Sequence, residues 1–219
     1  MLRAEDASNL KAGQKINNKK SLELRRKIIH IVFGSLLSFL IYFDLFFLPF
    51  WIGFLISVII VSLLLKEYKP RSKFALKIWK PFSNFILYFE REDEKIYLPL
   101  RGVITFILGC LLSYLLFAEK SIVVSTIFTL FIGDSTVALY GVFFGKLKYP
   151  WSPRKHVDAS LVGIILNSIF ISIFFPLPKA LFASIFTFFF ESFDIRFNSI
   201  PFDDNIFLPL LTGLVLTLI

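Results

Sequence analysis

Long apolar runs alternate with short polar segments along most of this chain. The runs cover roughly residues 27–45, 48–65, 99–118, 122–144, 157–175, 179–190 and 206–219. An α-helix needs about 20 apolar residues to cross the hydrocarbon core of a bilayer, and the first five runs approach or reach that length. The pattern predicts an all-α, polytopic integral membrane protein with about seven transmembrane helices.

The positive charges predict how such a bundle is oriented. Of the 24 Lys and Arg residues, 22 fall in four polar segments: 1–27, 66–101, 145–156 and 191–205. Lys120 and Lys179 fall in the other connecting segments. Because cytoplasmic loops carry the excess of Lys and Arg, we expect the N-terminus and these four segments in the cytoplasm and the C-terminus outside.

Composition supports a membrane protein and argues against other classes. The 219 residues are 56% hydrophobic, with a mean hydropathy of +0.74, which is too apolar for a soluble domain of this length. Cys110 is the only cysteine, so an intrachain disulfide is excluded and a cysteine metal site is disfavoured. The net charge of +8 lies between the apolar runs, which argues against nucleic acid as a partner. We expect a flexible basic tail over 1–22 and a single membrane domain over 23–219, compatible with a homo-oligomer.

Segment 66–95 has the pattern of a helix rather than of a simple loop. Apolar side chains fall on one helical face and lysines on the opposite face: Phe74, Ile78, Phe82, Phe85 and Phe89 against Lys73, Lys77 and Lys80. Such a helix is suited to the interface of an anionic membrane, bent or split at Pro81. The alternative is a solvated basic linker.

Asp134 places a carboxylate inside an apolar run. A charge at that depth is costly and marks a functional site by default. On a helix it shares a face with Ala138, Gly141 and Gly145, whose small size lets a backbone or a ligand approach. The alternatives are helix packing by small residues, or a structural carboxylate paired with His30 or an arginine. If Asp134 is functional, Asp134→Asn is expected to lose turnover while its melting temperature holds or rises.

Two further polar faces lie near the ends of predicted spans. Glu23, Lys27, His30 and Gly34 share a face where the first span begins, although ordinary positive-inside anchors would look similar. If the fifth span starts near His156, a second polar face follows, for which the alternative is hydrogen bonding between helices. That second face comprises His156, Ser160, Gly163 and Asn167.

The last polar cluster comes before the final apolar run. Asp203, Asp204 and Asn205 precede Pro209, which is poorly tolerated inside a helix. If the last helix starts at Pro209, its length is only about half the hydrocarbon core. Adjacent carboxylates beside an amide oxygen suit a hard cation such as Mg²⁺. The alternative is a polar turn in which Asn205 caps the helix.

Together these clusters offer acids, a basic cradle and an intramembrane groove. Divalent metal with Lys and Arg around phosphates is the usual equipment of phosphoryl transfer, and the groove indicates a lipid substrate. We expect Asp134, Asp203 and Asp204 to converge on one Mg²⁺ or Mn²⁺ ion.

Three stretches, in order, resemble the CTP-dependent polyprenol kinase family, which includes dolichol kinase, phytol kinase and the CTP-dependent diacylglycerol kinases and is related to phosphatidate cytidylyltransferases. RKIIHIVFG (26–34) is similar to the family's entry helix, and GDSTVALYGVFFGKLK (133–148) to its Gly-Asp, Gly and Phe-Gly-Lys signature. Glu191 with DDNIFLPLLTG (203–213) is similar to its C-terminal Asp-Asn-Pro element. Where the family reads Lys-Ser/Thr-x-Glu-Gly-Ser, this chain has KHVDAS (155–160), so Asp158 keeps the charge and Ala159 replaces a glycine. The long C-terminal signature of the cytidylyltransferases is missing, which favours a kinase.

The resemblance implies a CTP-dependent transferase that phosphorylates the hydroxyl of dolichol or another polyprenol. It gives catalytic roles to Asp134, Lys155 and Asp204. It gives phosphate or nucleotide binding to Arg26, Lys27, His30, Gly141, Gly145, Lys146, Lys148, Arg154, Asp158 and Asn205. The expected partners are a membrane lipid and a nucleoside triphosphate. Two alternatives remain: a CTP-dependent cytidylyltransferase acting on phosphatidate or its ether-lipid analogue, and a non-enzymatic lipid transporter or scaffold.

Overall fold

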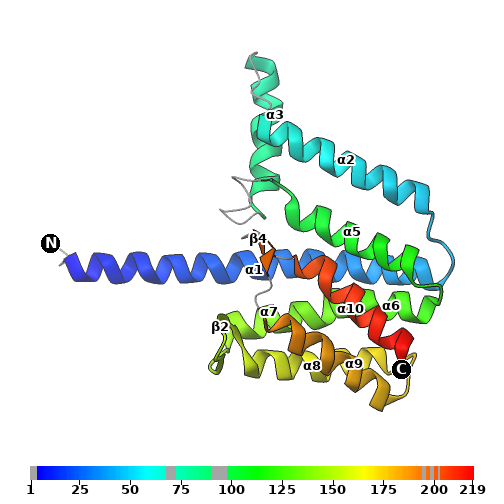
Figure 1. Cartoon of the computed structure of the whole chain (residues 1–219). Helices are drawn as coiled ribbons and strands as arrows, with labels where there is room; N and C mark the ends of the chain where they lie inside the picture. Colours follow the sequence, from blue (N-terminus) through cyan, green and yellow to red (C-terminus); the bar gives the residue numbers. More distant parts are fainter. Residues whose placement is uncertain (1–3, 68–72, 90–97, 194–195, 198–199, 202) are drawn as a thin grey trace.

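The computed structural model describes residues 4–67, 73–89, 98–193, 196–197, 200–201 and 203–219. The chain is mostly helical, which confirms the all-α prediction (Figure 1). The helices are α1 (Ala4–Tyr42), α2 (Leu48–Glu67), α3 (Lys73–Leu87), α5 (Arg101–Leu116), α6 (Lys120–Phe128), the π-helix η1 (Thr129–Gly133), α7 (Asp134–Phe143), α8 (Val157–Ile171), α9 (Leu177–Glu191) and α10 (Asp204–Leu218). Two short antiparallel hairpins pair β1 (Lys148–Tyr149) with β2 (Ser152–His156) and β3 (Arg196–Phe197) with β4 (Ile200–Pro201).

Most of the helices run back and forth along one direction (Figure 1). α6, η1 and α7 follow one another as a single long helix inside the bundle. The β1–β2 hairpin, the end of α9, the start of α10 and α3 gather at one end, and the C-terminus lies at the other. The described parts of the Lys- and Arg-rich segments therefore share one end of the bundle, while the side of a membrane on which that end lies stays a prediction.

Helix length alone singles out two candidate membrane spans among the described residues. α2 and the continuous helix Lys120–Phe143 are long and apolar enough to cross a bilayer. The core helix of a soluble protein passes the same test, and 72% of the relevant window of Lys120–Phe143 is buried. α5, α8 and α10 are apolar but shorter.

The bundle has an apolar core, polar groups that are paired between its helices, and an apolar outer surface. Asn167 of α8 is fully buried and donates to Ser184 of α9 at 3.0 Å, and Thr187 of α9 meets Thr212 of α10 at 3.0 Å between hydroxyl oxygens. For Asn167, the expected polar face is therefore used for hydrogen bonding between helices. The outside is apolar, most clearly along α2, where the exposed side chains are Phe50, Ile52, Ile56, Ile59, Ile60, Leu63 and Leu64.

Two glycines allow helices to approach closely. A Cβ built at Gly163 of α8 would lie 2.3 Å from Val137 Cγ2 of α7. A Cβ at Gly109 of α5 would lie 2.0 Å from the backbone oxygen of Asn205 in α10. Any larger residue at either position would push two helices apart.

α10 begins five residues before Pro209. Pro209 lies inside the helix, which starts at Asp204 with Asp203 as its N-cap. A proline in the second turn removes only the hydrogen bond to the carbonyl of residue 205, and that oxygen packs against Gly109 instead. The capping residue is Asp203, whose carboxylate accepts from the backbone N–H of Asn205 at 3.1 Å, rather than Asn205 itself.

Two other segments differ from the expectation. α1 continues back to Ala4, where the sequence analysis expects a flexible tail, and its N-terminal half projects beyond the bundle (Figure 1). Ala, Leu, Glu, Gln and Lys favour helix, and extending an existing helix needs no new nucleus. Residues 148–156, expected as a loop before the fifth span, form the β1–β2 hairpin.

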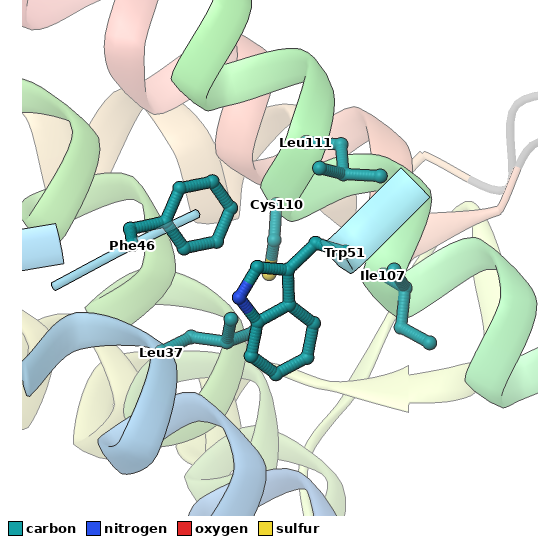
Figure 2. A pocket seen from close by; sticks show the side chains of 6 residues that line it. All are labelled: Leu37, Phe46, Trp51, Ile107, Cys110 and Leu111. Atoms are coloured by element: carbon teal, nitrogen blue, oxygen red, sulfur yellow. The ribbon is translucent and has the colours of Figure 1, made fainter. Parts of the chain in front are cut away.

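Trp51 fixes the start of α2 against the bundle. Its indole lies beside Leu37 of α1 and Cys110 of α5, around a small apolar pocket (Figure 2). The ring also stacks on Phe46 at 5.8 Å between centroids. The pocket is part of the core and presents no polar chemistry.

Candidate functional site

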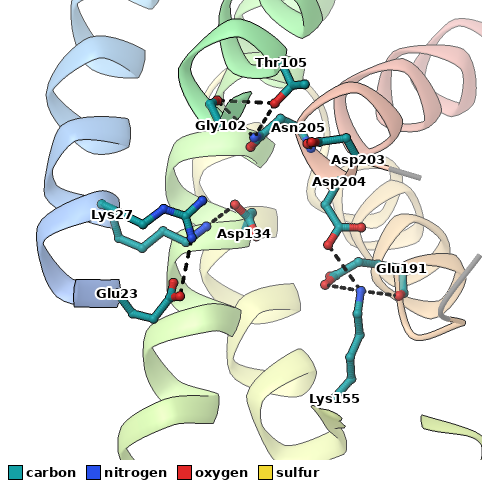
Figure 3. A network of polar contacts seen from close by, with 11 residues as sticks. Glu23, Lys27, Gly102, Thr105, Asp134, Lys155, Glu191, Asp203, Asp204 and Asn205 are labelled. Atoms are coloured by element: carbon teal, nitrogen blue, oxygen red, sulfur yellow. Dashed lines mark hydrogen bonds and ion pairs between the residues drawn. The ribbon is translucent and has the colours of Figure 1, made fainter. Parts of the chain in front are cut away.

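Five charged residues from five elements meet at one end of the bundle (Figure 3). We call this group the polar junction: Lys27 of α1, Asp134 of α7, Lys155 of β2, Glu191 of α9 and Asp204 of α10. Three ion pairs in two groups organise it: Lys27 is bonded to Asp134, and Lys155 is bonded to both Glu191 and Asp204. The charges of Asp134 and Asp204 each act on Glu191, so the two groups belong to one electrostatic unit.

The Lys27–Asp134 pair is the buried half of the junction. The Lys27 ammonium donates to Asp134 Oδ2, and the two side chains are only 7% and 11% exposed. Asp134 follows directly after η1, and its backbone N–H bonds to the carbonyl of Thr129, five residues back. A π-helical turn is rare and frequently found at functional sites. Here it sets the direction in which α7, and with it Asp134, leaves α6.

Lys155 organises the more open half. Its ammonium donates to Glu191 Oε1 at 2.9 Å and to the Glu191 backbone oxygen at 2.5 Å, and it lies 3.5 Å from Asp204 Oδ2. Glu191 is 5% exposed at its side chain, whereas Asp204 is 45% exposed. Asp204 is therefore the most solvent-accessible member of the junction.

Burial and neighbouring charges together raise the pKa values of both Lys155 and Glu191. Burial raises the pKa of Glu191 to about 7, and the carboxylates of Asp204 and Asp134 add to this effect while Lys155 opposes it. Burial alone would lower the pKa of Lys155, but Glu191 and Asp204 outweigh it and raise that pKa above its ordinary value. Lys155 is thus a permanent cation, and Glu191 titrates near neutral pH.

The β1–β2 hairpin is fastened so that Lys155 points into the junction. Trp151, at the turn, donates to Ser192 Oγ at 3.1 Å and stacks on Phe193 at 5.2 Å, just beyond α9. At the other side of the hairpin, Asp158 accepts from the backbone N–H of Lys146 at 2.8 Å. Asp158 therefore closes the hairpin onto α8, which accounts for its carboxylate without a nucleotide.

Several predicted binding residues lie outside the junction. The side chains of Lys146, Lys148 and Arg154 are exposed on and beside the hairpin. Gly141 and Gly145 face His156: a Cβ at Gly145 would lie 2.7 Å from His156 Cγ, and one at Gly141 3.4 Å from Nδ1. The imidazole lies beside both glycines; packing explains the small size of Gly145, whereas at Gly141 a Cβ would make only ordinary contacts.

Asp203 and Asn205 attach α10 to α5. Asp203 caps the helix and lies 3.4 Å from Arg101 Nε. The amide of Asn205 donates to Thr105 Oγ1 at 3.0 Å and to the Gly102 carbonyl at 3.4 Å. The amide nitrogen of Asn205 is thus bonded within the bundle, and its role in nucleotide binding stays a prediction.

The expected grouping of three aspartates around one metal ion is not formed. Across the described ranges, no three His, Cys, Asp or Glu side chains are close enough together to hold a metal. Asp134, Asp203 and Asp204 are each held by a different cation, Lys27, Arg101 and Lys155 respectively.

The face predicted on α1 is confirmed as a buried face. Glu23, Lys27 and His30 are between 5% and 7% exposed, and Gly34 packs on Phe131 of η1. Glu23 accepts from Arg26 at 3.4 Å. Lys27 was predicted to bind phosphate, and its ion pair with Asp134 was not predicted. Sequence reasoning also gave Glu191 no role, although a single acid closing a Phe-rich run was a usable signal.

Comparison with known proteins gives a similarity without an activity. The chain is 28% identical over 196 residues to "Uncharacterized protein MJ1137" of Methanocaldococcus jannaschii, a match that covers 89% of this chain and 92% of that protein. No family model matches the chain, and no solved structure matches it. A functional conclusion therefore has to come from the residues of this chain.

Proposed function

We propose that this chain is a multi-pass membrane enzyme that transfers a phosphoryl group from a nucleoside triphosphate, CTP by resemblance, to the hydroxyl of a membrane isoprenoid alcohol such as a polyprenol. The observation that carries the proposal is the polar junction: two lysines and three carboxylates joined at one end of an apolar bundle. The three sequence stretches that resemble the polyprenol kinase family supply all of it except Lys155.

The apolar outer surface supports a lipid environment. Hydroxyl and amide groups are paired between helices inside the bundle, while large apolar side chains cover α2 outside. Contiguous apolar surface on this scale is unfavourable in water and is normal against lipid. α2 and Lys120–Phe143 are the two helices of sufficient length, and the shorter ones would cross a thinned or locally adapted bilayer.

The residues of the junction suit phosphoryl transfer between a soluble donor and a lipid acceptor. Lys155 would neutralise the phosphate chain of the nucleotide, which approaches past the half-exposed Asp204. Asp134 would orient the acceptor hydroxyl and take its proton as the oxygen attacks the γ-phosphorus. The bond from the γ-phosphorus to the bridging oxygen breaks, and the nucleoside diphosphate leaves.

The junction also fits Mg²⁺ in its common mode. Mg²⁺ is usually held by one or two carboxylates together with substrate phosphates, so a group of three acids is not required. Glu191 Oε2 is buried and has no hydrogen-bond partner among the described residues, and Asp204 is half-exposed. Asp204 would hold the ion together with phosphate oxygens, and the ion would neutralise charge on the transferred group.

The test is product formation by the purified protein. Protein in nanodiscs is incubated with Mg²⁺, with CTP or ATP labelled at the α- or γ-phosphate, and with polyprenol, diacylglycerol or phosphatidate. The proposal expects γ-label in the lipid and release of nucleoside diphosphate. Release of pyrophosphate with α-label in the lipid would instead identify a cytidylyltransferase, and no nucleotide-dependent product would identify a transporter or scaffold.

The chain offers a matched control for the central residue. Asp134→Asn should abolish transfer, whereas Asp44→Asn should not. Asp44 also pairs with a lysine, Lys120, but this pair is largely exposed, with 74% and 51% of the side chains accessible. It connects the start of α6 to the α1–α2 turn, away from the junction. Equal turnover in the two variants would refute the role given to Asp134.

A further inference from the structure

A second feature lies beside the polar junction and has no part in the chemistry above. A cavity of about 360 Å³ lies between α1, α3 and the first turn of α5. Phe85, Ile86 and Phe89 line it from the α3 side, and Leu100 and Val103 from the α5 side. Cavities of this size and apolar character are typical of small-molecule sites.

One end of the cavity is polar. Arg26 and His30, one helical turn apart on α1, line it there. Gly102 leaves room for the guanidinium, since a Cβ built there would lie 3.1 Å from Arg26 Nη2. His30 in turn lies within electrostatic range of Asp134. The cavity thus has mostly apolar walls, and its polar lining comes from Arg26 and His30 on α1, the helix that also carries Lys27 of the junction.

α3 places the cavity where a membrane lipid can reach it. Ile78, Phe82 and Phe85 are 61%, 44% and 67% exposed, and Lys77 and Lys80 are exposed as well. α3 runs across the direction of α2 and α5 at the junction end of the bundle (Figure 1). An amphipathic helix in that orientation fits the interfacial placement predicted from its sequence. Phe74 and Lys73 of that predicted face lie outside the described side chains.

We infer that this cavity binds a lipid with one apolar chain and a terminal hydroxyl, with the chain against α3 and the hydroxyl at His30. The inference rests on the proposed function, because it identifies the cavity as the acceptor site of that reaction. A single narrow chain suits the volume better than the two chains of a phospholipid. The neutral hydroxyl suits an end in which Arg26 already has Glu23 as its ion-pair partner at 3.4 Å.

Photolabelling tests the location directly. Full-length protein in nanodiscs is irradiated with a geranylgeraniol analogue that carries a diazirine beside its hydroxyl, and labelled peptides are mapped by mass spectrometry. Because the diazirine sits beside the hydroxyl, we expect label within residues 26–30 or at the adjoining residues 102–103. Excess unlabelled geranylgeraniol should remove it. Label that is confined to other surfaces, such as α2 or α8, would overturn the inference.

A second test fills the cavity with a large side chain. Ile86→Trp and Val103→Trp should each lower labelling at least tenfold and raise the KM for the alcohol, with an unchanged Kd for CTP. Ile60→Trp, on the exposed face of α2, is the matched control and should behave as wild type. If Val103→Trp fails to fold, Ile86→Trp on the half-exposed α3 decides.

The outcomes separate the two proposals. Wild-type labelling and KM in Ile86→Trp would refute the cavity as acceptor site while leaving the kinase reaction intact. Labelling inside the cavity without any phosphorylated product would refute the kinase reaction and, with it, the cavity's role as an acceptor site, leaving only a lipid-alcohol binding site.

Discussion

Lys27 and Asp134 are 107 positions apart in the chain and form a buried ion pair between α1 and α7. The pair joins the first helix to the helix that carries the proposed catalytic carboxylate. It therefore has a structural role whatever chemistry Asp134 performs, and the effects on stability and on turnover have to be measured separately.

Asp134→Asn should be destabilising. It leaves Lys27 buried without a counter-charge, at a cost of about 3 kcal/mol. This reverses the expectation from sequence, which assumed that removing a lone buried charge would keep or raise the melting temperature. The double variant Lys27→Met/Asp134→Leu removes both charges and should recover most of the stability. Melting of both variants in detergent checks this.

The same double variant separates the catalytic role of Asp134 from its structural role. If Asp134 takes the proton of the acceptor, the refolded double variant should still turn over at least a hundredfold slower than wild type, about 2.7 kcal/mol in activation free energy. Near-normal turnover in a stable double variant would mean that the pair serves packing alone.

Lys155 should matter far more than the exposed cations nearby. Lys155→Met removes the cation bonded to Glu191 and Asp204, and we expect at least a tenfold rise in the Kd for CTP. Lys148→Met is the matched control, because that side chain is exposed on the same hairpin, and its Kd should change less than about threefold. Equilibrium binding of labelled CTP measures both. Equal losses would place the phosphates on the hairpin surface instead.

Glu191 should make stability depend on pH. Its pKa rises from 4.5 to about 7 on folding, chiefly through burial. Between these values the folded protein holds a proton that the unfolded chain releases. The contribution of Glu191 is therefore largest at low pH and is lost as the pH rises through 7, by at most about 3 kcal/mol. Melting from pH 4.5 to 8 should fall more steeply in wild type than in Glu191→Gln. Parallel curves would contradict this.

The loss of stability on replacing a glycine by alanine should depend on which atoms the new Cβ meets. Gly109→Ala drives a Cβ into a backbone oxygen at 2.0 Å, which can move only with α10. Gly163→Ala meets a Val137 methyl group at 2.3 Å, and Val137→Ala relieves it. Nothing lies within 4 Å of a Cβ at Gly53. We expect Gly109→Ala to cost the most, Gly163→Ala about 1–3 kcal/mol, and Gly53→Ala to be neutral or slightly stabilising. Thermal melting ranks them.

Labelling of single cysteines tests the orientation. In a Cys110→Ala background, Lys148→Cys on the exposed hairpin should react only with reagent that has entered the cell, and Glu119→Cys at the opposite end should react from outside. Residue 148 is chosen rather than Ser152 of the same hairpin, because Ser152 is fully buried and a cysteine there could not be labelled. Labelling of residue 148 from outside in intact cells would reverse the orientation.

The helices were predictable because each apolar run is bounded by charged or turn-forming residues. The run predicted at 48–65 is α2, Leu48–Glu67, and the run at 157–175 contains α8, Val157–Ile171. The start of α10 was not predictable by treating Pro209 as a breaker, because a proline near the N-terminus of a helix removes a single hydrogen bond. The β1–β2 hairpin was missed because its two prolines read as loop.

The site was only half predictable. Composition and depth identified Asp134, and the basic exit identified Lys155. Which lysine pairs with which acid depends on how α1, α7 and α9 pack, and no local pattern encodes a contact across 107 positions. The exposed lysines of the hairpin and the partly buried Lys155 look alike in sequence, because spacing along the chain does not report burial.

The π-helix η1 determines the direction, about the axis of α7, in which the proposed catalytic carboxylate lies. A π-turn accommodates one residue more than the α-turn it replaces, and each residue of an α-helix turns the chain by about 100°. If residues 129–133 formed a regular α-helical turn instead, with no residue deleted, α7 would be rotated by about that angle relative to α6. Asp134 would then leave the face it shares with Lys27, although every charged residue of the junction would still be present in the chain.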